Sequence, residues 1–324
     1  MGTDSASRHL LAPELAPMLE MLPVLDFSHG MGFFRQAFAL RERPPVPPEL
    51  AEVRCEERRI PGAHGAPDVR VLLYTPPGAA SVTRPAVLHI HGGGYVLGDP
   101  ELNDTSNRTY AKDLDCVVVS VDYRLAPETQ WPGALEDCFA VLNWLAREAG
   151  ALGIDPARIA VSGESAGGGH AVALAQHTRD RHGPAIAFLL LDSPMLDDRT
   201  GSGHAPHPYC GEFVWTPGQN RYGWGALLGV EPGSDAVPAG AVPARVESLA
   251  GLPPAFISVG ALDLFLEEDI EFARRLWRAG VACELHVVPG AYHGFFMAAQ
   301  APQTRQVERL RREALARALR TAAS

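Results

Sequence analysis

Ser165 lies between two glycines, in the stretch Gly163-Glu164-Ser165-Ala166-Gly167, where an apolar β-branched run gives way to an alanine-rich one. A serine at a tight junction between a buried strand and a helix is typical of a nucleophile elbow. The alternative is a glycine-rich turn that binds phosphate, but the lysine of a phosphate loop and the G-x-G-x-x-G spacing are both missing. The pattern therefore predicts that Ser165 is a nucleophile.

A serine hydroxyl is a weak nucleophile, so it needs a base, and the base needs an acid that orients it. His293 is best placed to be the base, because it lies in a glycine-containing loop after a late expected strand. His89 and His286 are expected inside strands. The alternative for His293 is a histidine that only packs within its loop.

Two aspartates compete for the role of the acid, because each follows an expected strand. Asp263 comes after residues 255–260 and is the favoured candidate, and Asp192 ends the run 185–192. Glu267 and Glu268 are less favoured because they fall in the next expected helix.

A tetrahedral intermediate also needs hydrogen-bond donors for its oxyanion. The sequence His91-Gly92-Gly93-Gly94-Tyr95 directly follows an expected strand, and glycines let backbone N–H groups face a site without a Cβ in the way. We expect donors at Gly92 and Gly93, with Gly94 also possible. Ala166 supplies another N–H at the start of a helix, where the helix dipole favours negative charge. The alternative is that the glycine run is only a flexible turn.

Strand and helix patterns alternate along most of the chain and must position these groups. Strands are expected at residues 55–60, 69–76, 86–90, 116–123, 158–163, 185–192, 255–260 and 283–290, and helices at 104–114, 133–150, from 166 onward, at 266–280 and at about 303–322. Such alternation predicts an α/β fold with a mostly parallel sheet that helices cover on both faces.

Two segments do not follow this alternation, and we expect them to form a cap over the site. Residues 1–48 contain an expected amphipathic helix from about residue 8 to 42, and residues 195–249 form a long insertion without a strand pattern. The core is then 49–194 together with 250–324. Side chains assigned to a substrate pocket are Phe34, Tyr95, Glu164, Phe213 and Trp215. The alternative is that the aromatic side chains only hold the cap together.

Composition restricts the classes of function. The 324 residues carry a net charge of −10, which argues against a nucleic-acid partner. The five cysteines are scattered and odd in number, which favours a reducing, cytoplasmic setting. His204, His207 and Cys210 have no specific metal-site spacing. We expect no signal peptide and no membrane span. The arginine-rich C-terminal helix is interpreted as a solvated face, because glutamates interleave with its arginines.

The set of motifs resembles the hormone-sensitive lipase family of α/β-hydrolases, the HGGG or type IV esterases. The resemblance covers about residues 70–296 and includes "HGGGY", "VDYRLAPE", "LGIDPARIAVSGESAGG" and "AGVACELHVVPGAYHGF". It implies an eight-stranded sheet with an antiparallel second strand, a helical cap, and the order Ser165, Asp263, His293 for nucleophile, acid and base. Two departures are Glu164, where many relatives have Asp, and "DLFLEE", where many have D-P-L-x-D-E.

The resemblance implies a serine carboxylesterase that acts through an acyl-enzyme, without metal or cofactor, and family members often form homodimers. The large aromatic side chains of the expected cap favour short- to medium-chain esters, because they should narrow the acyl channel. Amide or peptide hydrolysis and acyl transfer remain open, because the same triad serves these reactions. A non-catalytic ligand-binding relative is a further alternative, although His293 is present.

Overall fold

Eight strands form one sheet in the computed structural model, which describes residues 5–22, 32, 35, 36, 38, 40, 41, 43, 45–78, 83–205 and 207–320. The strands are β1 (Arg54–Ile60), β2 (Val69–Thr75), β3 (Arg84–Ile90), β4 (Val117–Asp122), β5 (Ile154–Glu164), β6 (Phe188–Asp192), β7 (Ala255–Gly260) and β8 (Cys283–Val288). Their order in the sheet is β1-β2-β4-β3-β5-β6-β7-β8. Only β2 runs antiparallel to both of its neighbours, and the pairs from β4 to β8 are parallel. The predicted eight-stranded, mostly parallel sheet with an antiparallel second strand is confirmed.

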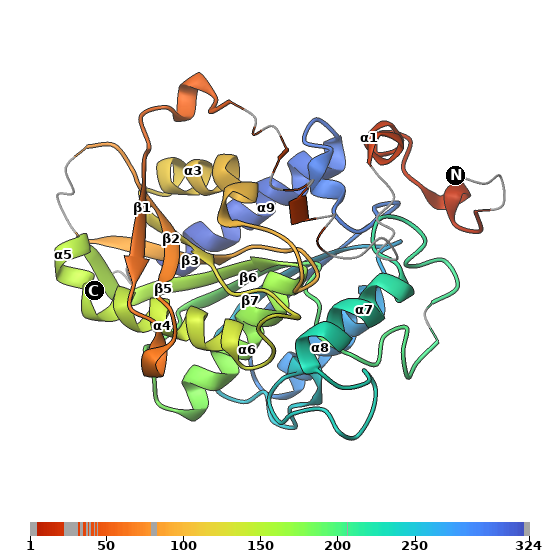
Figure 1. Ribbon diagram of the computed structural model, residues 1–324. Helices are drawn as coiled ribbons and strands as arrows, with labels where there is room; N and C mark the ends of the chain where they lie inside the picture. Colours follow the sequence, from red (N-terminus) through yellow and green to blue (C-terminus); the bar gives the residue numbers. More distant parts are fainter. Residues whose placement is uncertain are drawn as a thin grey trace.

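Helices cover both faces of this sheet, as Figure 1 shows. One face carries α3 (Asp104–Asp113) and α9 (Pro302–Leu319), and the other carries α4 (Gly133–Arg147), α6 (Ala166–Asp180) and α8 (Leu266–Arg278). Shorter helical turns are α5 (Ala149–Leu152), η3 (Pro48–Leu50), η4 (Ala63–Gly65), η5 (Pro100–Asn103) and η7 (Phe295–Met297). No helix in the described ranges has both the length and the apolar character needed to cross a bilayer.

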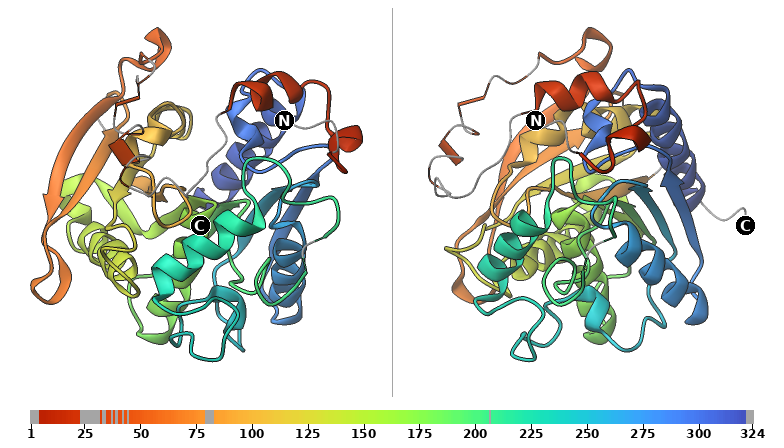
Figure 2. Two further views of the ribbon diagram at one scale, coloured as in Figure 1. Left: turned by 45° about the vertical axis from the view of Figure 1, so that its right-hand side comes forward. Right: turned by 90° about the vertical axis from the view of Figure 1, so that its right-hand side faces the viewer.

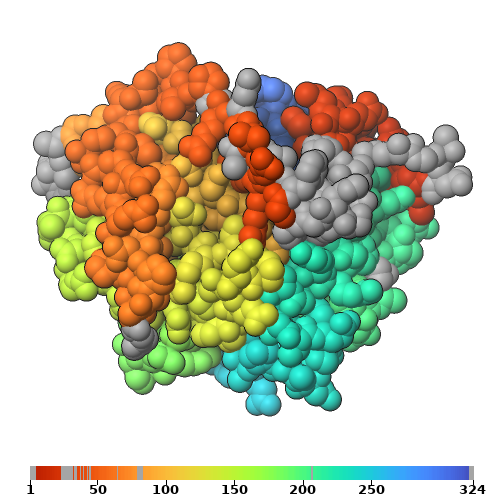
Figure 3. Space-filling view, viewed as in Figure 1, coloured from red at the N-terminus to blue at the C-terminus, as the bar shows by residue number. Residues whose placement is uncertain are grey.

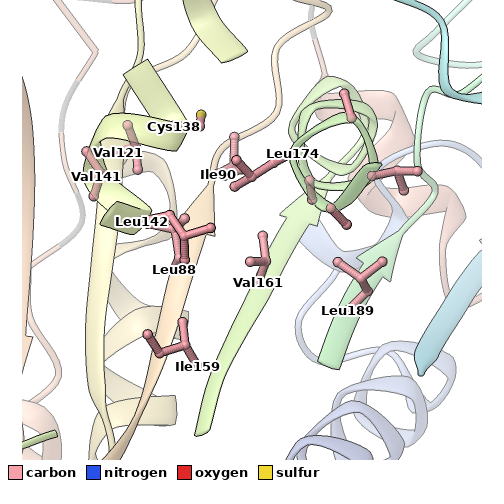
Figure 4. Close-up of a cluster of buried hydrophobic side chains, with 14 of the residues drawn as sticks. Leu88, Ile90, Val121, Cys138, Val141, Leu142, Ile159, Val161, Leu174 and Leu189 are labelled. Carbon is pink, nitrogen blue, oxygen red and sulfur yellow. The ribbon is translucent and has the colours of Figure 1, made fainter. Parts of the chain in front are cut away.

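The central strands are buried on both faces, and their side chains alternate between two apolar layers. Leu88 and Val161 point toward α4 and α6, and they belong to the same buried cluster as Leu142 of α4 and Leu174 of α6, as Figure 4 shows. The neighbouring residues Val87 and Ala160 belong to the layer under α3 and α9. The polar side chains near the ends of these strands must therefore also alternate between the two faces.

The N-terminal segment lies beside the loop after β8 and the start of α9, and Figure 2 shows α1 (Ala16–Met21) next to these elements. The Tyr292 hydroxyl donates a hydrogen bond to the Leu15 carbonyl at 3.1 Å. The segment expected to be helical from about residue 8 is helical only in parts where the structure describes it, with η1 (Arg8–Leu10), a turn and then α1. Prolines account for the break, since Pro17 is tolerated only in the first turn of α1.

The cap insertion, residues 195–249, contains α7 (Pro217–Leu228) and η6 (Pro243–Arg245), and its described residues contain no strand. Thr216 and Gln219 form a capping box that fixes the start of α7. The buried Trp224 and Leu227 on α7 share an apolar cluster with Tyr95 of the glycine loop. In Figure 3 the turquoise insertion meets the yellow segment that precedes α4. The insertion therefore packs against the elements that carry the predicted site.

Candidate active site

The turn at Ser165 is strained and held from two sides. Strand β5 ends at Glu164 and α6 begins at Ala166. Ser165 between them has φ 53° and ψ −121°, a backbone conformation that residues with a Cβ rarely adopt. The Ser165 N–H donates to the Asp192 carbonyl at 2.9 Å, and the Ser165 carbonyl accepts from the Met195 N–H at 2.9 Å. A Cβ at Gly167 would lie 2.1 Å from the Ile90 carbonyl oxygen, so only glycine fits beside β3. The turn has the geometry expected of a nucleophile elbow.

A hydrogen-bond chain joins three residues that are far apart in the sequence. The distance from His293 Nε2 to Ser165 Oγ is 3.0 Å, and that from His293 Nδ1 to Asp263 Oδ2 is 2.9 Å. The carboxylate can only accept, so Nδ1 carries the proton and Nε2 is left to accept the serine hydroxyl proton. The other carboxylate oxygen, Asp263 Oδ1, accepts from the Phe265 N–H at 3.0 Å. The arrangement can deprotonate the hydroxyl and stabilise the imidazolium that results.

Two aromatic rings flank the imidazole of His293. The ring of Phe265 meets it edge-on at 5.1 Å, and the indole of Trp215 lies at 6.2 Å between centroids. Trp215 also covers the glycine loop, because a Cβ at Gly94 would lie 2.1 Å from its ring. The structure thus places the Trp215 indole between the glycine loop and His293. Phe265 was not singled out from the sequence, although it follows the predicted acid by two residues.

The glycine loop is fixed by hydrogen bonds to its carbonyl groups. The Tyr123 hydroxyl donates to the His91 carbonyl at 2.9 Å, and His91 Nδ1 donates to the Gly92 carbonyl at 2.8 Å. Burial lowers the pKa of His91 to about 4, so its ring stays neutral and keeps this role at neutral pH.

The N–H groups around Ser165 are available to a ligand. Gly92 lies directly beside the serine, since a Cβ there would be 3.5 Å from Ser165 Cβ. Within the part of the chain that the structure describes, the N–H groups of Gly93, Gly94 and Ala166 donate to no other residue. Ala166 is also the first residue of α6, where the helix dipole favours negative charge. Three of the predicted oxyanion donors therefore have no partner among the described residues, and Gly92 and Ala166 lie next to the serine.

Asp192, the competing acid, lies on the other face of the sheet from α6 and has its own partners. Its Oδ1 accepts from the Ser258 hydroxyl at 3.0 Å, and its Oδ2 accepts from Arg311 Nη1 at 3.0 Å. Burial raises the pKa of Asp192 to about 6, and Arg311 offsets only part of this effect. The structure thus brings Asp263, and not Asp192, to His293.

Other side chains assigned to the pocket lie elsewhere. The Glu164 carboxylate accepts from His89 Nε2 at 3.1 Å and from Asn103 Nδ2 at 3.2 Å, below the elbow. Tyr95 is buried and donates its hydroxyl to the Met195 carbonyl at 3.0 Å. Phe213 packs in an apolar cluster that holds the cap to α1. These three assignments to the pocket wall are corrected, because backbone alternation and cap packing take the side chains away from Ser165 Oγ.

The remaining predictions concern Phe34 and the two glutamates that were less favoured as the acid. Phe34 lies outside the described residues. Glu267 is exposed, and Glu268 accepts hydrogen bonds from the Leu196 and Asp197 N–H groups.

The possible metal ligands of the insertion do not form a cluster. Cys210 Sγ lies 3.4 Å from His207 Nδ1, and His204 is exposed. Among the residues that the structure describes, no three or more His, Cys, Asp or Glu side chains are grouped to hold a metal ion.

Comparisons with known proteins agree with this geometry. A family model described as the alpha/beta hydrolase fold matches residues 87–297. The chain is 35% identical over 304 residues to esterase LipI of Mycobacterium tuberculosis, with 87% of each chain covered. It is 36% identical over 301 residues to carboxylesterase NlhH of the same species, with 91% of this chain and 92% of the other covered. Among solved structures, a bacterial heroin esterase has a TM-score of 0.89 and 35% identity, with 97% of this chain and 99% of that chain covered.

Proposed function

The chain belongs to the hormone-sensitive lipase family of α/β-hydrolase esterases, and from this premise we propose that it is a serine carboxylesterase that acts through an acyl-enzyme on Ser165. The observation that carries the proposal is the chain of hydrogen bonds from Ser165 Oγ through His293 to Asp263, at 3.0 and 2.9 Å. Carboxylic ester hydrolysis is the reaction that the names of the related proteins share.

The proposed reaction uses these residues in two half-reactions. His293 Nε2 takes the Ser165 hydroxyl proton while Oγ attacks the ester carbonyl carbon, and Asp263 stabilises the imidazolium. The N–H groups of Gly92, Gly93 and Ala166 donate to the oxyanion, and that of Gly94 is a further candidate donor. The imidazolium then protonates the leaving alcohol, and a water molecule repeats the sequence on the acyl-enzyme.

A preference for acyl chains of roughly two to eight carbons is the finer part of the proposal, because a capped pocket ends after a limited number of methylenes. The indole of Trp215 between the glycine loop and His293 supports it, since this bulky ring narrows the space above the nucleophile. The measurement is kcat/KM for p-nitrophenyl esters from acetate to palmitate. We expect a maximum at acetate to octanoate. A maximum at palmitate, or a jump in rate once the substrate forms micelles, would contradict the chain-length proposal alone.

The same panel separates the alternative reactions. An amide or peptide hydrolase would cleave matched anilides at least as fast as the esters, and an acyltransferase would form a new ester when an alcohol is added. A binding protein would leave every ester intact.

We also propose that the protein acts in a reducing compartment such as the cytoplasm, on a small ester and without a nucleic-acid partner. All five cysteines are free thiols, which supports this setting. A homodimer is the oligomeric state that we propose, and sedimentation of the purified protein tests it, since a monomer would contradict the proposal.

A further inference from the structure

Four polar side chains form a row on the face of the sheet that α9 covers, and each comes from a different, adjacent strand. His89 is on β3, Glu164 on β5, Asp192 on β6 and Ser258 on β7. Glu164 is in register with Asp192, and Asp192 with Ser258. All four are buried, with 5% exposure or less. A polar row of this kind is costly in an apolar layer unless every group has a partner.

Arg311 of α9 supplies the charge that this row needs. Its Nη1 donates to Asp192 Oδ2 at 3.0 Å, and its Nη2 lies 3.7 Å from Glu164 Oε1. Arg311 is only 3% exposed, so the expectation that the arginines of this helix all belong to a solvated face is wrong at this position. The residue stands between two carboxylates that β5 and β6 place side by side.

Each member of the row is close in the chain to a group of the active site. Glu164 directly precedes Ser165, and the Asp192 backbone carbonyl accepts the Ser165 N–H at 2.9 Å. His89 precedes the glycine loop by three residues and binds the same Glu164 carboxylate at 3.1 Å. Ser258 lies on the strand that leads to Asp263. The row therefore links the strand ends that carry the nucleophile, the oxyanion loop and the acid.

We propose that Arg311 is a positioning residue for Ser165, an inference that rests on the proposed function. Its guanidinium neutralises Glu164 and Asp192 and so keeps the ends of β5 and β6, and the elbow between them, in the reactive arrangement. Removing the charge leaves two buried carboxylates that repel each other beneath the nucleophile. A displacement of about 1 Å at a reacting group can cost about a hundredfold in rate.

The pH dependence of this effect follows from the groups around Arg311. Besides Asp192 and Glu164, these are Glu308 on α9, whose carboxylate lies 3.0 Å from Nη1, and the phenol of Tyr110 on α3. The imidazole of His89 faces Glu164 from β3, and the ring of His91, which is neutral over the pH range of the experiment, is also nearby. Without Arg311, one of the neighbouring carboxyl groups of Glu164 and Asp192 can hold a proton at lower pH, whereas two charged carboxylates repel each other at higher pH. The defect should therefore grow as the pH rises.

The experiment compares Arg311→Met with Arg311→Met/Asp192→Asn and with the control Arg312→Met. Arg312 is the next residue of α9 and pairs at the surface with Asp113. kcat and KM for p-nitrophenyl butyrate are measured from about pH 6 to 9, and melting curves establish folding. We expect Arg311→Met to lower kcat at least about tenfold near pH 8 with little change in KM. Near pH 6 the decrease in kcat should be smaller. The double variant should recover most of kcat and lose the added pH dependence, and Arg312→Met should match the wild type.

An Arg311→Met protein with wild-type kcat at every pH would overturn the inference. So would a defect that is independent of pH and persists in the double variant. If Arg311→Met does not fold, Arg311→Lys is measured in its place. An ammonium group cannot contact both carboxylates as the guanidinium fork does. A lower kcat near pH 8 is then expected, and a wild-type value overturns the inference. A wild-type protein that cleaves no ester would instead refute the proposed function, and this inference with it.

Discussion

Asp263→Asn should reduce kcat strongly while the protein stays folded, because the substitution reverses one hydrogen bond of the site. Asp263 Oδ1 accepts the Phe265 N–H and Oδ2 accepts the His293 Nδ1 proton. An asparagine must keep its oxygen toward the Phe265 N–H, so its NH₂ group faces His293. Nδ1 then has to accept, and the proton moves to Nε2, which can no longer take the proton of Ser165.

The size of this effect follows from the loss of the base. A triad with the wrong imidazole tautomer loses about 10³- to 10⁴-fold in kcat, which corresponds to about 4 to 5.5 kcal/mol of transition-state stabilisation. Since Asp263 is fully buried, water cannot replace the missing acceptor. The assay is kcat for p-nitrophenyl butyrate, with a melting curve for each variant.

Asp192→Asn is the matched comparison, since Asp192 also ends a strand and is also buried. It should stay within about tenfold of the wild type, because it acts on the elbow only through packing and Arg311. The reasoning is refuted if folded Asp192→Asn loses more activity than folded Asp263→Asn.

Two further predictions follow from single contacts. Gly93→Ala should lower kcat by about 10²- to 10³-fold, as removal of an oxyanion donor does. The reason is that Gly93 has φ 125° and that a Cβ there would lie 2.0 Å from the Leu97 carbonyl oxygen, so the loop must move. Gly150→Ala, which has open space around its Cβ, is the control, and equal kcat values for the two variants would contradict the assignment. Asp269→Asn should become more stable relative to the wild type as the pH rises. Both Asp269 carboxyl oxygens are buried without a partner among the described residues. Burial raises the pKa of Asp269 well above its ordinary value, and the nearby carboxylates of Glu268 and Asp263 raise it further. The folded wild type holds this proton while the unfolded chain loses it near pH 4, so its free energy of unfolding should fall by about 1.4 kcal/mol per pH unit up to the folded-state pKa. Urea unfolding at several pH values measures this difference, with the exposed Glu267→Gln as control, and parallel pH curves for Asp269→Asn and the wild type would refute it.

The sequence predicted the sheet because its strands are β-branched runs separated by helical patterns, and those patterns are local. It also predicted the residues of the hydrogen-bond chain, since the motifs around Ser165, Asp263 and His293 each specify a turn at a strand end. The choice between Asp263 and Asp192 needed the face on which each side chain leaves the sheet. Alternation along β6 puts Asp192 on the same face as Leu190, under α9, but this face is known only once the layers are placed.

The side chains that line the pocket could not be predicted from the sequence for a related reason. Tyr95 and Phe213 are aromatic residues near the site in sequence, yet packing of the cap onto the core buries them. The role of Arg311 could not be found from a pattern in α9, because its partners lie more than a hundred residues away on β5 and β6. Contacts of such long range follow from the strand order, which the order of elements in the chain does not give directly.

The most direct test of the account is to find the residue that is acylated. The wild type and Ser165→Ala are treated with a fluorophosphonate probe, the labelled peptide is identified by mass spectrometry, and the hydrolysis of p-nitrophenyl butyrate is followed in parallel. We predict a single label on Ser165, and for Ser165→Ala no label and a turnover reduced by about 10⁶-fold. A label on another residue, or a Ser165→Ala protein that keeps its turnover, would contradict the claim that Ser165 is the nucleophile.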